Sequence, residues 1–277
     1  NEPVFYEGVT IKGDLDFTTT GNEYPESSGY YRTCISSPLT FINCKFEGKI
    51  TAYRTDEDKF LHLALFEKNL SFISCEFHDE FSLREAIIRG IVIFTKSTFQ
   101  KEANFEGAFF QFKDIYFTNT IFRSTTRFQR SVFTGNVSFM KSEFEKGVSF
   151  QHAVFHSNIQ MGAVRFLDYL DFSMCKATGN AVFNYSQFMK KCIFQRTSFH
   201  ARTEFITCKF IENANFQAVH FNGETDFSKS EFYKEWNLKE TIFTFGKPKT
   251  DEIVKGEKAA FIFENTQYIQ FSPFEIN

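Results

Sequence analysis

The chain has 277 residues, 42% of them hydrophobic and 23% charged, with a formal net charge of −3 at pH 7 and a pI of about 6.1. This balance argues against a basic groove that would follow the phosphates of a nucleic acid, and no apolar run reaches the roughly 18 residues needed to span a bilayer. Phenylalanine supplies 41 residues, far above its usual share, so we expect a core in which aromatic rings stack.

The first 60 residues are predicted to open the fold and to carry projecting loops. Residues 9–17 alternate in polarity like a strand. Residues 18–38 are rich in Thr, Ser, Gly and Tyr and indicate a long loop, after which residues 39–46 return to the alternating pattern. The charged stretch 47–59 is expected to project as a second loop.

A short repeat fills residues 61–245. Between Phe66 and Phe243 a large apolar residue recurs at alternating steps of five and six, with one extra residue between Phe110 and Phe117. From Phe94 onward, only three of twenty-eight such positions are not phenylalanine, namely Met161, Ala177 and Leu238. The residue two places earlier is never charged, and the residue between the two is unrestricted.

This inward, outward, inward order over three residues is the period of an extended strand, because a helix would need apolar recurrence at three and four. Self-similarity at a short fixed period is typical of a solenoid, whose units bury their apolar faces only by stacking on their neighbours. We therefore expect an all-β solenoid made of very short strands and turns.

The segments VSFMKSEFEKGVSFQHAVF (137–155) and TEFITCKFIENANFQAVHF (203–221) show the paired positions most clearly. In these positions the chain resembles the pentapeptide-repeat family, over about residues 61 to 245. The resemblance implies a right-handed quadrilateral β-helix with four units per coil and an internal Phe stack, here of about eight to ten coils. Units of five and six residues would then give 22-residue coils, with two of the four corners looser than in the family.

Residues 246–277 are predicted to form a C-terminal cap. The stretch 246–258 is polar and is followed by two short strand-like runs around Asn265. A cap would protect the last coil from edge-to-edge pairing with another chain. The expected organisation is thus 1–60, 61–245 and 246–277.

One coil of the repeat is irregular, because Met161 and Ala177 replace phenylalanine. The missing ring at Ala177 would leave a void unless a neighbour fills it, and such a void costs several kcal/mol. Met174 and Tyr185 are the candidates to fill it, and a small ligand pocket there is the alternative.

Five of the six cysteines lie at the small position of a unit, so we expect free, buried thiols with no two in direct vertical contact. The exception is Cys34, which lies outside the repeat.

A core filled with rings leaves no central cavity for an active site, so we expect no enzyme and no cofactor. His156 and His200 share an outward position two coils apart, about 10 Å, which is too far for a shared metal. A sugar-cleaving enzyme would need clustered carboxylates in a groove. Asp168, Asp171 and Glu204 are the only loosely placed candidates.

The predicted partner-binding residues form an apolar strip. Folded into 22-residue columns, four consecutive coils present apolar side chains at one outward position, and the neighbouring column adds two more: Leu167, Met189, Ile211 and Tyr233, then Ile206 and Met140. A contiguous strip of this kind marks a contact surface. The alternative is that the terminal segment or a projecting loop covers it.

These features favour a non-enzymatic rigid scaffold or protein-interaction subunit in a bacterial cell-envelope assembly, including membrane-associated complexes. The partner would bind a side face or the N-terminal loops. The chain begins at Asn1 without Met, from which we expect an extracytoplasmic location, with a cytoplasmic one as the alternative. The alternative function, implied by the family resemblance, is mimicry of DNA to bind a type II topoisomerase. That role requires a strongly acidic surface, which the near-balanced charge disfavours.

Overall fold

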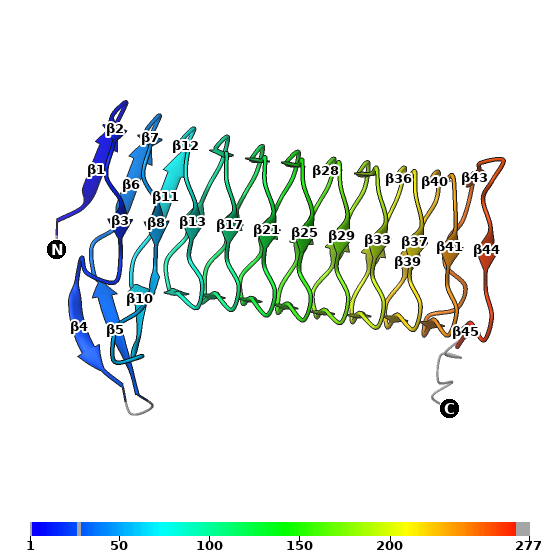
Figure 1. Cartoon of the computed structure of the whole chain (residues 1–277). Coiled ribbons are helices and arrows are strands. Elements are labelled where there is room, and N and C mark those ends of the chain that lie inside the picture. Colours follow the sequence, from blue (N-terminus) through cyan, green and yellow to red (C-terminus); the bar gives the residue numbers. More distant parts are fainter. Residues whose placement is uncertain (1, 27–28, 270–277) are drawn as a thin grey trace.

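The computed structural model describes residues 2–26 and 29–269, and these residues form a four-sided β-helix (Figure 1). The chain visits four parallel sheets in turn, here named sheets A to D, so sheet A lies opposite sheet C and sheet B lies opposite sheet D. Most strands contain only two residues. The all-β solenoid predicted from the sequence is confirmed.

Sheets A and B contain 10 and 11 strands. Sheet A runs through β1 (Val4–Glu7), β6 (Leu39–Ile42), β11 (Leu70–Ile73), β15 (Val92–Ile93), β19 (Ile115–Tyr116), β23 (Val137–Ser138), β27 (Ile159–Gln160), β31 (Ala181–Val182), β35 (Thr203–Glu204) and β39 (Thr225–Asp226). Sheet B runs through β2 (Thr10–Ile11), β7 (Lys45–Phe46), β12 (Glu76–Phe77), β16 (Thr98–Phe99), β20 (Ile121–Phe122), β24 (Glu143–Phe144), β28 (Arg165–Phe166), β32 (Gln187–Phe188), β36 (Lys209–Phe210), β40 (Glu231–Phe232) and β43 (Val254–Lys255).

Sheets C and D contain 11 and 13 strands. Sheet C runs through β3 (Leu15–Asp16), β8 (Ile50–Thr51), β13 (Phe81–Ser82), β17 (Ala103–Asn104), β21 (Thr126–Arg127), β25 (Val148–Ser149), β29 (Leu170–Asp171), β33 (Cys192–Ile193), β37 (Ala214–Asn215), β41 (Trp236–Asn237) and β44 (Phe261–Ile262). Sheet D runs through β4 (Asn22–Pro25), β5 (Tyr30–Ile35), β10 (Leu61–Phe66), β14 (Ile87–Ile88), β18 (Phe109–Phe110), β22 (Val132–Phe133), β26 (Val154–Phe155), β30 (Lys176–Ala177), β34 (Ser198–Phe199), β38 (His220–Phe221), β42 (Ile242–Phe243) and β45 (Gln267–Tyr268), with β9 (Tyr53–Thr55) paired to β10 off this path.

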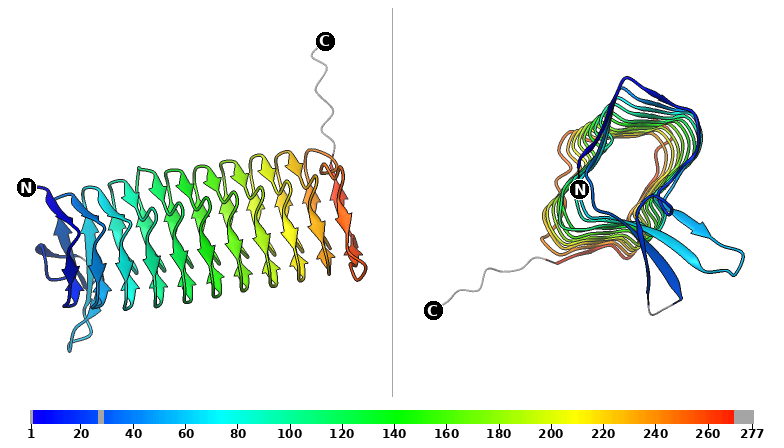
Figure 2. Two further views of the ribbon diagram at one scale, coloured as in Figure 1. Left: turned by 90° about the horizontal axis from the view of Figure 1, so that it is seen from above. Right: turned by 90° about the vertical axis from the view of Figure 1, so that its left-hand side faces the viewer.

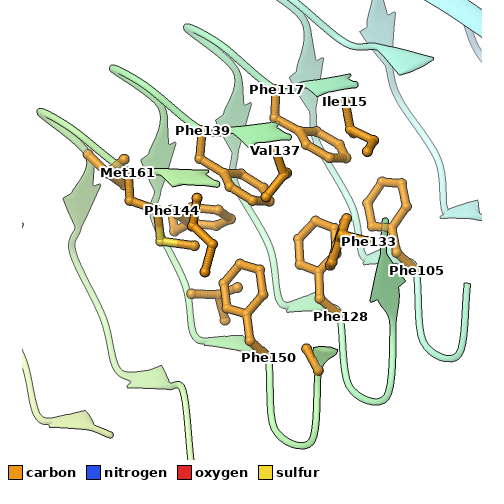
Figure 3. Close-up of a cluster of buried hydrophobic side chains, with 14 of the residues drawn as sticks. Phe105, Ile115, Phe117, Phe128, Phe133, Val137, Phe139, Phe144, Phe150 and Met161 are labelled. Atoms are coloured by element: carbon orange, nitrogen blue, oxygen red, sulfur yellow. The ribbon is translucent and has the colours of Figure 1, made fainter. Parts of the chain in front are cut away.

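Rings one coil apart stack inside the tube, as the sequence predicts. The rings of Phe105 and Phe128 are 4.7 Å apart and 4° from parallel, and those of Phe128 and Phe150 are 4.8 Å apart and 1° from parallel. Figure 3 shows this column beside the column of Phe117 and Phe139. Such pairs add on the order of 1 kcal/mol each to the area they bury.

Two kinds of corner alternate around each coil. After sheets A and C the corner is tight, and its second residue has positive φ, as at Lys141 (58°) and His152 (61°). After sheets B and D the corner is one residue longer, which makes these the units of six residues. In the corner after sheet D, a Cβ on Gly179 or Gly223 would lie 2.4 Å from the backbone of Ser157 or Ala201, which occupy the same position in the preceding coil, so glycine at these two positions relieves the contact.

The small polar residues that precede several rings of sheet B by two places form hydrogen bonds between coils. Ser186 Oγ donates to the carbonyl of Met161 at 2.6 Å and accepts from the backbone N of Val164 at 2.9 Å. Cys208 occupies an equivalent place, with its Sγ 3.1 Å from the carbonyl of Phe183. A small polar side chain thus ties successive coils together inside the wall.

The irregular coil is filled by a residue that the sequence argument did not single out. The ring of Phe172 tilts by 49° and 44° against its column neighbours Phe150 and Phe194. It stacks instead between Phe155 (5.5 Å, 10°) and Phe199 (6.2 Å, 5°), toward the place of the ring missing at Ala177. The expectation that Met174 or Tyr185 fills the void was wrong, since these side chains are 37% and 64% exposed. The rotation of Phe172 removes the basis for a ligand pocket there.

All six cysteines are free, but the expectation that none are vertical neighbours was wrong. Strand β12 pairs with β7, with Glu76 opposite Lys45, which places Cys75 beside Cys44. The inserted residues between these coils displace the pair from the 22-residue spacing. Burial raises the pKa of Cys75 to about 12, so this thiol remains protonated at neutral pH.

The N-terminal interruptions form an ordered arm rather than loops. Strands β4, β5, β10 and β9 make a four-stranded sheet that stands off the side of the tube, as two hairpins (Figure 2). The stretch 18–38, expected to be a loop, thus contains two strands. Of the stretch 47–59, residues 50–51 form β8 in sheet C, and the hairpin leaves the tube only at β9.

At the other end, β43, β44 and β45 pair in parallel with β40, β41 and β42. The described part of the segment predicted to be a cap is therefore a further coil of the helix. The remainder of that segment, residues 270–277, lies outside the described residues. Nowhere in residues 2–26 and 29–269 is there a helix that could cross a bilayer.

Candidate interaction surfaces

The apolar strip predicted from the sequence lies on sheet B, at the corner toward sheet C. Leu167, Met189, Ile211 and Tyr233 each follow a strand of sheet B and lie one above another, since the backbone N of each donates to the inward Phe of the preceding coil at 2.9 to 3.0 Å. Three of these side chains are half-buried, and Tyr233 is 38% exposed. Ion pairs form a rim, as between Lys234 and Glu212 (2.6 Å).

The other two strip residues stand apart. Met140 and Ile206 follow strands of sheet A and are separated by two intervening coils, whose equivalent residues are Gly162 and Asn184. They are therefore isolated apolar side chains and do not widen the strip. The hairpins extend from sheet D, opposite sheet B, so they do not cover the strip.

The acidic residues considered for sugar cleavage do not form a site. Asp171 lies on sheet C, where its carboxylate accepts hydrogen bonds from Ser173, and Glu204 lies on the opposite sheet A, where it pairs with Arg202 at 2.7 Å. Asp168 lies at the corner between sheets B and C. Within the described residues, no group of three or more His, Cys, Asp or Glu is placed to hold a metal ion.

A second apolar surface, which the sequence argument missed, runs along the outside of sheet D. Its five consecutive coils carry outward apolar side chains that lie opposite one another in the strand register: Leu65, Ile87, Phe109, Val132 and Val154. Leu65 is buried at the base of the arm, and the other four side chains are half-buried. The column ends where Lys176 pairs with Val154. At the other end it continues onto the arm, because Leu63 and Leu61 precede Leu65 on the same face of β10.

A groove lies where the arm meets the tube. It has a volume of about 450 Å³ and is lined by residues of the arm and of the first coils: Tyr30, Arg32, Tyr53, Leu61, Leu63, Arg84, Glu85, Ile87, Gly107 and Phe109. We call it the arm groove. Its floor belongs to the apolar column of sheet D.

Two arginines line the arm groove, each over a tyrosine ring. The guanidinium of Arg84 lies 4.7 Å from the ring centre of Tyr53, and that of Arg32 lies 5.3 Å from the ring centre of Tyr30. Arg32 also pairs with Glu26 through its Nε at 3.2 Å. The rings and guanidiniums hold one another in place by cation–π attraction.

Each of these arginines also has an enclosed nitrogen without a hydrogen-bond partner. Among the described residues, four enclosed side-chain N or O atoms lack a partner, and Arg32 Nη1 and Arg84 Nε are two of them. The nearest carboxylate to Arg84 Nε is that of Glu106 at 4.0 Å, which also pairs with Arg130. Enclosed donors without acceptors are costly, so the surrounding side chains do not fully satisfy either guanidinium.

The opposite face of the arm is fixed by one buried histidine. His62 Nδ1 lies 2.5 Å from Glu23 Oε1 on the first hairpin, and its Nε2 lies 3.0 Å from Asp56 Oδ2 in the turn of the second. The ring also stacks on Tyr31 at 5.0 Å. Carboxylates only accept, so both contacts are hydrogen bonds when both ring nitrogens carry hydrogen. His62 thus joins the two hairpins.

A signal for the arm was present in the sequence. Residues 30–35 (YYRTCI) and 61–66 (LHLALF) each alternate between two faces, which is the strand period. The second of these segments puts Leu61, Leu63 and Leu65 on one face. What the sequence could not show is that these two segments pair, because 25 residues separate them and three strands of the tube, β6, β7 and β8, lie between.

The comparisons with known proteins identify the repeat. Residues 110–154 match the family model for pentapeptide repeats (9 copies). The search of curated proteins gives no match. A solved structure of QnrB1, a plasmid-mediated fluoroquinolone resistance protein, aligns at 15% sequence identity over 69% of this chain and 91% of that chain, with a TM-score of 0.18. At that score the alignment says nothing about what this chain binds.

Proposed function

We propose, from the premise that this chain is a pentapeptide-repeat protein, that it is a non-enzymatic rod that binds a partner protein through its N-terminal arm. The observation that carries the proposal is the arm groove, with its floor continuous with five coils of outward apolar side chains on sheet D. A contiguous apolar surface rimmed by charge is typical of a contact site.

The packing of the tube fits the role of a rigid support for these surfaces. The inward positions are filled by stacked rings from Phe41 to Phe243. Backbone hydrogen bonds join each coil to the next at 2.7 to 3.3 Å. A filled, cross-bonded tube keeps the arm groove and the strip at fixed positions on opposite sides.

Site-specific photo-crosslinking in the native host tests this proposal. A photoreactive amino acid would be placed at Phe109 in the arm groove, at Met189 in the strip, and at the exposed corner residue Arg196 as a control. We expect one protein adduct of defined mass from Phe109 and none from Arg196. An adduct from Met189 alone would move the binding site to the strip, and equal adducts from all three positions would contradict a defined surface.

The surface charge supports this function over DNA mimicry. Several carboxylates on the tube are paired with bases of an adjacent coil, as in Glu143 with Arg165 and Glu231 with Lys209 (3.2 Å). A duplex mimic needs unpaired acidic groups in rows. We therefore expect the protein to leave supercoiling by a type II topoisomerase unchanged, with and without inhibitor, and protection of that enzyme would favour the alternative.

The cell-envelope location remains a proposal. Fractionation of the host with antibody detection would check it, and recovery with cytoplasmic markers would contradict it.

A further inference from the structure

The arm groove offers more than apolar area, and its polar atoms indicate what kind of group would fit. Leu61, Ile87 and Phe109 supply a hydrophobic floor. Beside them, the incompletely paired guanidiniums of Arg32 and Arg84 belong to the lining of the groove, and the Arg84 side chain is 38% exposed. A ligand that complements the groove in charge as well as in shape therefore combines an apolar group with an acceptor of hydrogen bonds from arginine.

A carboxylate is the acceptor that matches these donors. Guanidinium binds carboxylate through short, charge-assisted hydrogen bonds, which are stronger than bonds to a neutral acceptor. The nearest carboxylates do not meet the need. Glu26 uses only the Nε of Arg32, and Glu106 lies 4.0 Å from Arg84 Nε while pairing with Arg130. Stacking on Tyr30 and Tyr53 keeps both guanidiniums at the groove.

One acidic side chain competes for the site. Glu85 also lines the arm groove, and its carboxylate occupies the space beside Gly107, where an added Cβ would lie 2.5 Å from Glu85 Oε1. An incoming carboxylate would be repelled by Glu85 and attracted by the two arginines. Glu85 therefore supplies a variant whose effect has the opposite sign.

We propose that the arm groove binds an extended segment of the partner protein that carries Asp or Glu two residues away from a bulky apolar residue. The carboxylate accepts from Arg32 and Arg84, and the apolar side chain lies on Ile87 and Phe109. Side chains two residues apart lie on the same side of an extended segment, so both groups can face the groove. This inference deepens the proposed function and depends on it.

Selection from a randomised library of displayed ten-residue peptides tests the inference, with the full chain as the target. The comparison target is the double variant Arg32→Gln, Arg84→Gln, with Arg165→Gln on sheet B as the matched control. Thermal unfolding checks that each variant is folded. We expect the full chain and the Arg165→Gln variant to enrich peptides with Asp or Glu two residues away from Phe, Leu, Ile or Trp, and the double variant to lose that enrichment.

Binding of one enriched peptide then gives magnitudes. Replacing its acidic residue by the matching amide should weaken binding at least tenfold to the full chain, and less than twofold to the double variant. Glu85→Gln should strengthen binding of the acidic peptide, and Phe109→Thr should weaken it.

Several outcomes would overturn the inference. Enrichment without acidic residues, or enrichment that the double variant retains, would show that the arginines do not choose the ligand. No enrichment at all would show that the arm groove does not bind a linear segment. If crosslinks from Phe109 still identify a partner in those cases, the proposed function stands and only the ligand chemistry fails. If the crosslinks identify a second copy of this chain, the partner is the protein itself.

Discussion

The tube and the arm of this molecule are built on opposite principles. In the tube, nearly every coil repeats the same inward rings, so packing is regular and the outward positions are free to vary. In the arm, the repeat is interrupted, two hairpins that pair through β5 and β10 are also tied by His62, and enclosed arginine donors are left unpaired. The comparison teaches that the repeat supplies rigidity, whereas departures from it supply the features suited to recognition.

The largest effect is expected for Phe172→Ala in the tube. This ring fills the space of the phenylalanine missing at Ala177 and lies at the boundary of two columns. Its loss should lower the free energy of unfolding by about 3–5 kcal/mol, the range for Phe→Ala in a core. Chemical denaturation measures it, with Phe128→Ala in a regular column as the control. A loss below that of Phe128→Ala would show that the irregular coil is loosely packed.

A smaller loss is expected for Ser186→Ala. The substitution leaves the backbone N of Val164 and the carbonyl of Met161 enclosed without their partner, which should cost about 1–3 kcal/mol. Ser186→Cys should cost less, because Cys208 fills an equivalent place. Denaturation of both variants checks this order, and equal losses would show that the hydrogen bonds do not matter.

In the arm, His62→Ala should act locally. The two hairpins lose the contacts with Glu23 and Asp56 that join them, while the tube keeps all of its rings. We expect faster amide hydrogen exchange in residues 22–25 and 53–60 and unchanged exchange in residues 94–243. Faster exchange throughout the tube would contradict the separation of the two regions.

The smallest effect is a difference in thiol reactivity without any change in stability. Burial raises the pKa of Cys208 to about 12, so this thiol is protonated at pH 8. Because the side chain is also buried in the core, an alkylating reagent does not reach it. Half-buried Cys34 on the arm should be the first cysteine alkylated in the native protein. Although burial also raises its pKa, it remains within reach of solvent. Mass spectrometry after brief alkylation measures the order, and early labelling of Cys208 would indicate that the tube opens.

The irregular coil shows the limit of reading side chains from a repeat. Its position was visible in Met161 and Ala177, but the residue that fills it was not. The choice of Phe172 depends on how a ring in sheet C can turn toward a gap in sheet D, which is a matter of packing in three dimensions. The Cys44 and Cys75 pair was missed for a related reason, since an insertion changes which residues are vertical neighbours.

The repeat is enough to predict an all-β solenoid, the inward rings, the two kinds of corner and the outward column of Leu167, Met189, Ile211 and Tyr233, and the family resemblance adds the four-sided coil. These features are predictable because nearly every coil obeys the same local rule and only stacking satisfies that rule. The arm, the column on sheet D and the groove between them depend on tertiary contacts. These arise where segments of unlike sequence meet, and no local period records which surfaces come into contact.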